Sequence, residues 1–290
     1  MLIRLAPWLF VTMWATGYIG MKLGAPYAEP MTFLSIRFLA VLALLIPIFY
    51  VLGVPQLPRR EWLRAVFIGA WLHGIYLGAV LWAIKNGLAA GIAALIISLQ
   101  PIVVSIAAPI FLGENIQPRH WLGLLLGSFG VVLVIFPNFD PADAAISSQT
   151  FIVCLLSLGS ITFATLYQKA KAANLDLRAS LIPQYVGAAF VVSVAALAME
   201  TREVVWSGQL LFAQAWLVLV LSIGAVSLFL YLLRENEAWR TSALFYLIPP
   251  VTALFAWLVF DEKLTAVQLL GMGIVMIGVL IVRQPHQQAK

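Results

Sequence analysis

The sequence predicts an all-α integral membrane protein with ten transmembrane helices arranged as two inverted five-helix repeats. Of its 290 residues, 63% are hydrophobic and only 10% are charged. Such a composition leaves too little polar surface to cover a soluble core. The apolar residues fall into runs of roughly 20, the length that crosses a hydrocarbon layer of about 30 Å. The third observation is an internal duplication, which fixes how the helices are grouped.

Residues 93–134 occur again, without a gap, as residues 241–282. The two stretches share ten identities in 42 aligned positions. Shared hydrophobicity alone does not explain the match, because a proline, a carboxylate and two glycines are among the identities. The chain is therefore an internal duplication. The identical pairs include Pro101 with Pro249, Glu114 with Glu262, Gly123 with Gly271, and Gly130 with Gly278.

Ten apolar runs follow one another along the chain, separated by short connections that carry prolines, glycines and polar residues. An arginine at position 4 followed by an apolar run could suggest a signal peptide, but the run is long and continues the pattern, so we expect it to be the first span. The predicted spans are residues 5–24, 32–52, 62–84, 88–112, 120–136, 150–170, 181–199, 210–232, 238–260 and 265–282.

Each repeat contains five spans, so the second repeat enters the bilayer from the opposite side. We expect residues 1–140 to form the first repeat and residues 141–290 the second, with Glu114 and Glu262 at opposite faces. Inverted repeats are common in transporters, which hold substrate near the midplane between the repeats.

Cations predict the orientation, since cytoplasmic loops are rich in Lys and Arg. With a cytoplasmic N-terminus, 12 cations lie inside and four lie outside, which places both termini in the cytoplasm. The outer four are Lys22, Lys85, Arg202 and Lys263. The net charge of +5 thus reflects topology, and we expect the lipid bilayer, with no nucleic acid, as the partner surface.

Several motifs resemble the EamA-like drug/metabolite transporter superfamily over essentially the whole chain. The first span carries Trp14-Ala15-Thr16-Gly17-Tyr18 followed by Lys22, and the second carries Pro30 and Arg37. The repeated proline, glutamate and Leu-Gly pattern completes the likeness. The resemblance implies a ten-helix exporter in a bacterial inner membrane, most similar to the branch that exports aromatic and other neutral amino acids.

Prolines interrupt one span of each repeat. Pro101 lies near the middle of the fourth span, and Pro249 and Pro250 lie near the middle of the ninth. Each proline removes a backbone N–H and crowds a carbonyl of the preceding turn, so both helices should bend or open there. The prolines are candidate hinges, and a static kink is the alternative.

Polar and aromatic residues at mid-span are the candidate substrate-binding groups. An apolar zwitterion suits them, because rings can hold its side chain and ammonium while hydroxyls and an amide bind its carboxylate. Hydrogen bonding between packed helices is the alternative role. The candidates are His73, Tyr76, Gln100, Ser98, Trp14, Tyr18 and Tyr246.

Three charged residues are candidate gating groups. Glu114 and Glu262 occupy equivalent repeat positions, where each could pair in alternate states, or simply mark a helix end. Arg37 lies roughly 8 Å into the second span, at about 1.5 Å per residue, so we expect it to snorkel outward or pair with Glu29 or Glu262. A direct role in substrate binding or gating is the alternative.

Other functional classes find little support. The sequence has no HExxH, nucleophile elbow, P-loop or dinucleotide fingerprint, and its three histidines are too dispersed for a metal site. We therefore expect a protein that is not an enzyme and has no cofactor, metal or required oligomer. His73 is the one well-placed group for proton coupling, so a proton-coupled antiporter remains an alternative to a facilitator, as does a channel or scramblase.

Overall fold

In a computed structural model, the chain is a bundle of helices, described for residues 2–138, 147–260 and 264–283. Every predicted span is helical within these ranges, and the ends differ from prediction by a few residues. The helical spans are α1 (Leu2–Gly24), α2 (Pro30–Val51), α3–η2–α4 (Arg59–Lys85), α5–α6 (Ala90–Leu112), α7 (Pro118–Ile135), α8 (Ser148–Ala172), α9 (Leu177–Met199), α10–η5–α11 (Gly208–Glu235), α12–η6–α13 (Ala238–Phe260) and α14 (Ala266–Arg283).

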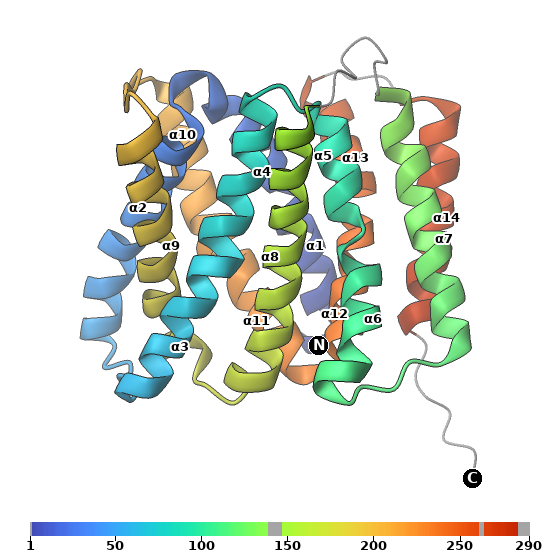
Figure 1. Ribbon diagram of the computed structural model, residues 1–290, viewed down its shortest axis with the longest axis horizontal. Helices are drawn as coiled ribbons and strands as arrows, with labels where there is room; N and C mark the ends of the chain where they lie inside the picture. The colour runs from blue at the N-terminus through green and yellow to red at the C-terminus, as the bar shows by residue number, and fades with distance from the viewer. Residues whose placement is uncertain (1, 139–146, 261–263, 284–290) are drawn as a thin grey trace.

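The spans stand side by side and alternate in direction (Figure 1). Within the described ranges, eight of them satisfy both length and hydropathy criteria for crossing a membrane, and a ninth apolar helix, Ala266–Val282, is shorter. The start of α1 and the end of α14 lie at the same end of the bundle (Figure 1). We call this end the N-terminal end and the other the opposite end. The predicted repeat boundary, at residues 140 and 141, lies outside the described residues.

Helices α7 and α14 pack antiparallel through glycines, and their contacts confirm the inverted repeat. A Cβ added to Gly123 would lie 2.7 Å from the carbonyl oxygen of Gly278, and one on Gly130 would lie 2.7 Å from that of Gly271. The repeat shift of 148 residues turns Gly123 into Gly271 and Gly130 into Gly278. It therefore exchanges one contact with the other, as a two-fold axis between the helices requires.

Four of the spans are irregular near their middles, and the irregular segments are equivalent between repeats. Segment η2 (Ala70–Ile75), between α3 (Arg59–Gly69) and α4 (Tyr76–Lys85), is π-helical. So is η5 (Leu217–Ala225), between α10 (Gly208–Trp216) and α11 (Val226–Glu235). Shifting η2 by 148 residues places it inside η5. The second pair of irregular segments lies in the two spans that contain the prolines.

Both proline-containing spans are broken, as the sequence predicts. Helix α5 (Ala90–Ser98) ends before Leu99, and α6 begins at Gln100 with Pro101 in its first turn. In the other repeat the 3-10 turn η6 (Leu244–Leu247) separates α12 (Ala238–Ala243) from α13 (Ile248–Phe260). A proline is compatible with a first turn, where its missing N–H needs no partner, so each helix restarts at its proline.

Candidate functional site

The two π-helical segments form the centre of the candidate site, because side chains from other helices bond a backbone carbonyl in each. Ser160 of α8 donates to the Trp71 carbonyl of η2 at 2.7 Å, and Ser157 donates to that of Tyr76, directly after η2, at 2.8 Å. In η5 the Ser222 carbonyl accepts from the Tyr185 hydroxyl of α9. Carbonyls freed at membrane depth need such partners, since lipid supplies none. π-Helical turns are frequent at functional sites, so these segments mark the candidate site on structural grounds.

His73 lies in η2 and is buried, with 4% of its surface exposed. Its imidazole stacks on the Tyr185 ring of α9, with ring centroids 5.2 Å apart and planes 14° apart. The Tyr185 hydroxyl donates to the carbonyl of Ser222 in η5. Tyr185 therefore links the π-helical segment of the first repeat to that of the second.

Arg37 is buried beside these groups, which overturns the prediction that it snorkels outward or pairs with Glu29. It is 3% exposed, and its Nε donates to Ser222 Oγ at 2.9 Å. Glu29 instead pairs with Lys85 at the opposite end. The predicted alternative partner, Glu262, lies outside the described residues. Residue counting places Arg37 within reach of the membrane surface, but it cannot show that a hydroxyl of the other repeat holds the side chain inside.

Gln100 and Tyr246 connect the broken spans in a second group of contacts. Gln100 Nε2 donates to Ser242 Oγ of α12 at 3.2 Å, so it bridges the two repeats at the break in the fourth span. The Tyr246 hydroxyl bonds Ser128 Oγ of α7 at 2.7 Å. Pro249 and Pro250 follow in α13. Both polar groups thus lie beside the breaks at which the proline-containing helices restart.

The other predicted binding residues are more scattered. Trp14 of α1 belongs to an aromatic cluster, with centroids 5.2 Å from both Phe10 and Phe245. Tyr76 is 8% exposed, whereas Tyr18 is 46% exposed and stands apart from the buried groups. Ser98 donates to a carbonyl of its own helix, that of Leu95. The structure therefore joins His73 with Arg37, and Gln100 with the broken ninth span, but does not gather all seven residues around one cavity.

Glu114 holds the beginning of a helix in the other repeat. Its carboxylate accepts from the backbone N–H of Ala238 at 2.7 Å and of Trp239 at 3.4 Å, at the start of α12. Burial raises the pKa of this carboxyl, and the two backbone hydrogen bonds oppose that rise. Lys169 caps the end of α11 nearby, donating to the carbonyls of Leu233 and Asn236. The Glu114 contacts join the two repeats at the N-terminal end, and the Lys169 contacts hold the second repeat together beside them.

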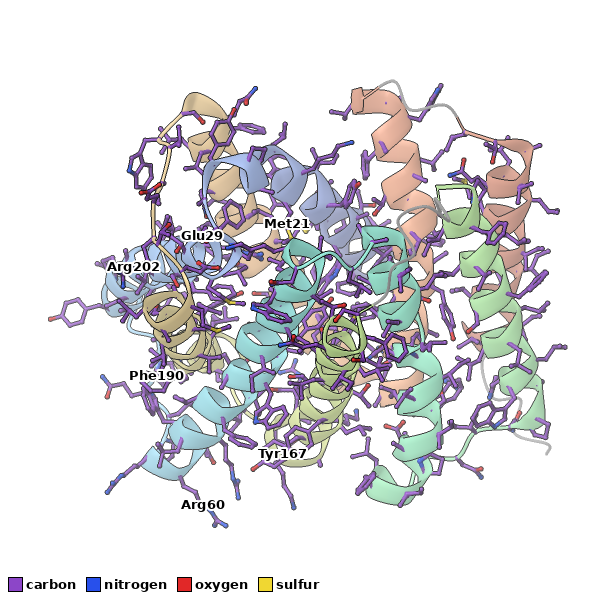
Figure 2. The ribbon with its side chains drawn as sticks, turned by 45° about the horizontal axis from the view of Figure 1, so that its top comes forward. Met21, Glu29, Arg60, Tyr167, Phe190 and Arg202 are labelled. Carbon is purple, nitrogen blue, oxygen red and sulfur yellow. The ribbon has the colours of Figure 1, made fainter. Side chains whose placement is uncertain are left out.

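The opposite end is joined by two other glutamates. Glu200 accepts from the backbone N–H groups of Met31 and Thr32, at 2.8 and 2.7 Å, and so caps α2. Glu29 binds Lys85 and lies beside Arg202, whose backbone N–H donates to it at 3.3 Å (Figure 2). The Lys85 ammonium and the Thr201 hydrogen bonds lower the pKa of Glu29 to about 2. Arg60 projects from the other end of the bundle (Figure 2).

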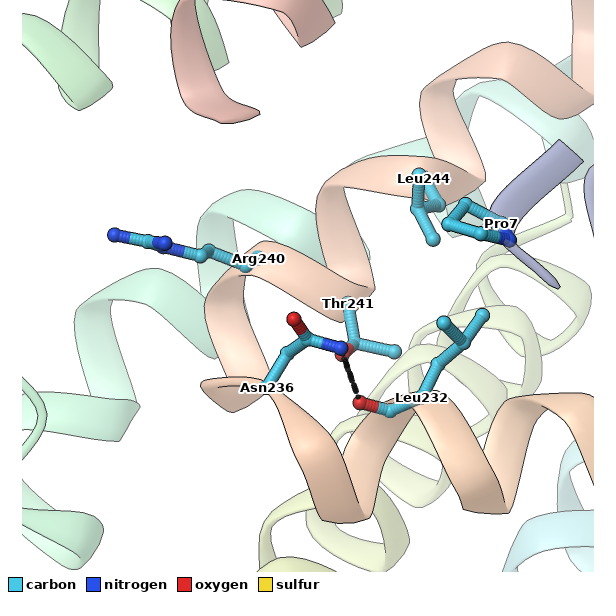
Figure 3. A pocket seen from close by; sticks show the side chains of 6 residues that line it. All are labelled: Pro7, Leu232, Asn236, Arg240, Thr241 and Leu244. Atoms are coloured by element: carbon cyan, nitrogen blue, oxygen red, sulfur yellow. Dashed lines mark hydrogen bonds between the residues drawn. The ribbon is translucent and has the colours of Figure 1, made fainter. Parts of the chain in front are cut away.

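A cavity of about 130 Å³ opens at the N-terminal end, between α1, α11 and the α12–η6 segment (Figure 3). Inside it, Asn236 Nδ2 and Thr241 Oγ1 both donate to the carbonyl of Leu232, at 2.9 and 3.1 Å. Binding pockets usually exceed about 300 Å³, so this space is too small to hold a whole cargo molecule of drug size. Its lining residues are Pro7, Leu232, Asn236, Arg240, Thr241 and Leu244.

The potential metal ligands of the described chain are spread apart. Among the described residues, no three His, Cys, Asp or Glu side chains gather in a way that could hold a metal ion. The one cysteine, Cys154, is buried and free. The groups that do converge are the His73 imidazole, the Arg37 guanidinium, the Tyr185 phenol and the Ser222 hydroxyl, which can bind polar solutes through hydrogen bonds.

Sequence reasoning missed the π-helical segments and with them Tyr185 and Ser222. A change from α to π hydrogen bonding leaves no proline or polar pattern at these positions. Gly69 is the one signal in the sequence that could have pointed to η2. Having no side chain, it lets α9 approach the start of η2: an added Cβ would lie 1.9 Å from the carbonyl of Gln184.

The inverted repeat and its interrupted central helices together define a membrane transporter.

Comparison with known proteins identifies the family to which this transporter belongs. The sequence model of the EamA-like transporter family matches residues 5–136 and again residues 150–284. The chain therefore belongs to the EamA-like transporter family, and the double match coincides with the two repeats. It is a multi-pass membrane transporter of the drug/metabolite transporter superfamily.

Curated relatives are distant but cover nearly the full chain. The chain is 23% identical over 272 residues to "Uncharacterized inner membrane transporter YedA" of Escherichia coli (strain K12), covering 93% of this chain and 87% of the relative. It is 23% identical over 283 residues to "Probable amino-acid metabolite efflux pump" of the same strain, covering 94% and 92%. A solved structure titled "Crystal structure of protein" shares the fold, with a TM-score of 0.79, 16% identity and coverage of 97% and 96%.

Proposed function

We propose that this protein exports neutral amino acids, aromatic ones among them, and related small metabolites across a bacterial inner membrane. The observation that carries the proposal is the set of four interrupted spans, paired by the repeat symmetry, with His73 and Gln100 at the interruptions. Interrupted helices at a repeat interface are where transporters bind their substrates. Inner-membrane transporters and an amino-acid metabolite efflux pump among the relatives support the direction and the cargo class.

The chemistry of the interruptions suits a zwitterion with an apolar side chain. Aromatic rings of Trp14, Tyr76 and Tyr246 offer faces for an apolar side chain and for an ammonium group. The Gln100 amide and the imidazole of His73 offer hydrogen bonds, and Gln100 Oε1 and His73 Nε2 are buried without a partner among the described residues. A substrate group can satisfy such atoms at a moderate cost in desolvation.

Alternating access would then follow from the symmetry. In this proposal each repeat is one of two units that rock about the α7–α14 contact, and Pro101, Pro249 and Pro250 are the hinges. Glu114 closes or releases the N-terminal end through α12, with Glu262 as its repeat equivalent. Both termini are cytoplasmic in this arrangement, so the 130 Å³ cavity is the cytoplasmic entrance. A monomer suffices for the cycle.

The test is transport by purified protein in liposomes, screened against a panel of amino acids. We expect saturable, stereoselective flux of neutral amino acids, and we expect His73→Ala, Tyr76→Ala and Gln100→Ala each to lower it at least tenfold, since each removes a group from the site. Tyr50→Ala is the matched control, because the Tyr50 side chain is 87% exposed on α2. Full flux in all three site variants, or flux that does not saturate, would contradict the proposal.

A further inference from the structure

Arg37 is a buried cation that the protein satisfies only in part. A guanidinium has five N–H donors. Its Nε donates to Ser222 Oγ, and its Cζ lies over the Phe38 ring, 5.6 Å from the centroid. Its Nη1 is buried and has no hydrogen-bond partner among the described residues. An orphaned charged donor inside a membrane protein is costly, because neither lipid nor packed side chains replace its hydration.

No carboxylate balances this charge within the described part of the chain. The ion pairs found there join Lys85 to Glu29, Arg178 to Asp176, Arg234 to Glu235 and Arg240 to Glu237. The titratable groups that act on Arg37 electrostatically are the Tyr185 phenol and the His73 imidazole. Neither is an anion near neutral pH. Arg37 therefore differs from the cations that form ion pairs, which lie at the ends of the bundle.

Both oxygens of Ser222, the residue that holds Arg37, are already engaged. Two further buried atoms lack a hydrogen-bond partner among the described residues: His73 Nε2, and Oε1 of Gln184, whose side chain interacts with His73. The carbonyl of Ser222, which could have accepted from Arg37, is taken by the Tyr185 hydroxyl. The Ser222 hydroxyl already binds Arg37 Nε. A small species that accepts hydrogen bonds and carries negative charge complements this set.

We propose that Arg37, His73, Tyr185 and Ser222 form an anion site that binds one small monoanion between the two repeats. One guanidinium balances one negative charge, and the aromatic walls formed by Phe38 and Tyr185, with centroids 5.7 Å apart, disfavour a larger dianion. Arg37 belongs to the first repeat, and Ser222 to the π-helical segment of the second. An anion bound here would therefore hold η5 against α2 and η2.

Two sources can supply such a monoanion, and both present the same chemistry. One is the carboxylate of the cargo, in which case the inference rests on the proposed function and names the group that Arg37 binds. The other is an inorganic anion such as chloride, which needs no assumption about cargo. The two sources differ in which compound stabilises the purified protein.

Thermal unfolding in detergent, followed by tryptophan fluorescence, tests the site. The wild type, Arg37→Gln and Arg60→Gln are each heated in sodium chloride and in sodium HEPES, a bulky sulfonate, at equal ionic strength. They are then heated in HEPES with L-phenylalanine or with L-phenylalaninamide, which lacks the carboxylate. Arg60 is exposed on α3, so its variant controls for the loss of one positive charge.

We expect a saturable rise of Tm by about 5 °C or more in wild type and Arg60→Gln, since a ligand at 100 times its Kd stabilises the state that binds it. The rise should vanish in Arg37→Gln and return, at higher ligand concentration, in Arg37→Lys, which restores a cation. In HEPES alone, Arg37→Gln should unfold no earlier than the wild type, because it removes an unbalanced charge. If Arg37→Gln does not fold, the comparison uses Ser222→Ala, which removes the neutral partner and should weaken the anion response several-fold.

Each result decides between the sources or against the site. A response to chloride identifies an inorganic anion, and it stands even if no amino acid is transported. A response to L-phenylalanine but not to its amide identifies the cargo carboxylate. No response to either compound in the wild type, or an equal response in Arg37→Gln, would overturn the anion site.

Discussion

Substituting Gly130 by alanine tests the two-fold contact between α7 and α14. The added Cβ would lie 2.7 Å from the Gly271 carbonyl oxygen and 2.8 Å from the Val275 backbone N. Both are backbone atoms, so the helices must separate, and overpacking of this kind costs about 1–3 kcal/mol. The better helix propensity of alanine offsets about 0.5–1 kcal/mol of this cost. We expect a net loss of about 1 kcal/mol, or roughly 2–4 °C in Tm for a chain of this size.

The assay is thermal unfolding of purified variants, with two comparisons. Gly271→Ala places its Cβ 2.7 Å from the Gly130 carbonyl, so the symmetry predicts a similar loss. Gly273→Ala, on the same helix, meets nothing within 4 Å and should be neutral or slightly stabilising. Unchanged Tm in both Gly130→Ala and Gly271→Ala, or a loss confined to one of them, would refute the two-fold packing.

Two further predictions concern contacts between the repeats. Glu114→Ala removes the cap of α12 and should cost about 1 kcal/mol of stability, whereas Glu114→Gln keeps an acceptor. Because burial raises the native pKa of Glu114 above its ordinary 4.5, the folded state holds this proton more tightly. Wild-type stability should therefore fall as pH rises from 4.5 through the native pKa, and the slope should be shallower in Glu114→Gln; equal slopes in a pH series of Tm would exclude this origin. Tyr246→Phe removes the 2.7 Å bond to Ser128 and should lower stability by about 1 kcal/mol, measured by the same unfolding assay, and no change in Tm would mean that the bond contributes nothing.

The helices were predictable from the sequence because membrane thickness fixes the length of an apolar run. Predicted span 238–260 coincides with α12–η6–α13, and the breaks at Leu99 and at Leu244–Leu247 occur where the prolines predict them. The glycines that are identical between the two repeats likewise lie at the α7–α14 contact. Local residue chemistry was sufficient in each case.

The candidate site was predictable only in part, since its groups come from segments far apart in the sequence. His73 could be singled out as a buried imidazole, but its partner Tyr185 lies 112 residues later and has no local signal. By residue counting, Arg37 is close enough to the membrane surface to reach it, yet Ser222 of the other repeat holds it inside. Depth along a helix can be read from sequence, whereas the direction of a side chain depends on neighbouring helices.

Counterflow in liposomes tests most directly whether the two repeats alternate access to a shared site. Vesicles loaded with an unlabelled neutral amino acid are diluted into a trace of the labelled compound, with and without an imposed pH gradient. A facilitating carrier that faces one side at a time predicts transient accumulation of label above equilibrium, unaffected by the gradient. Identical label uptake by loaded and empty vesicles, as through a pore, would contradict alternating access.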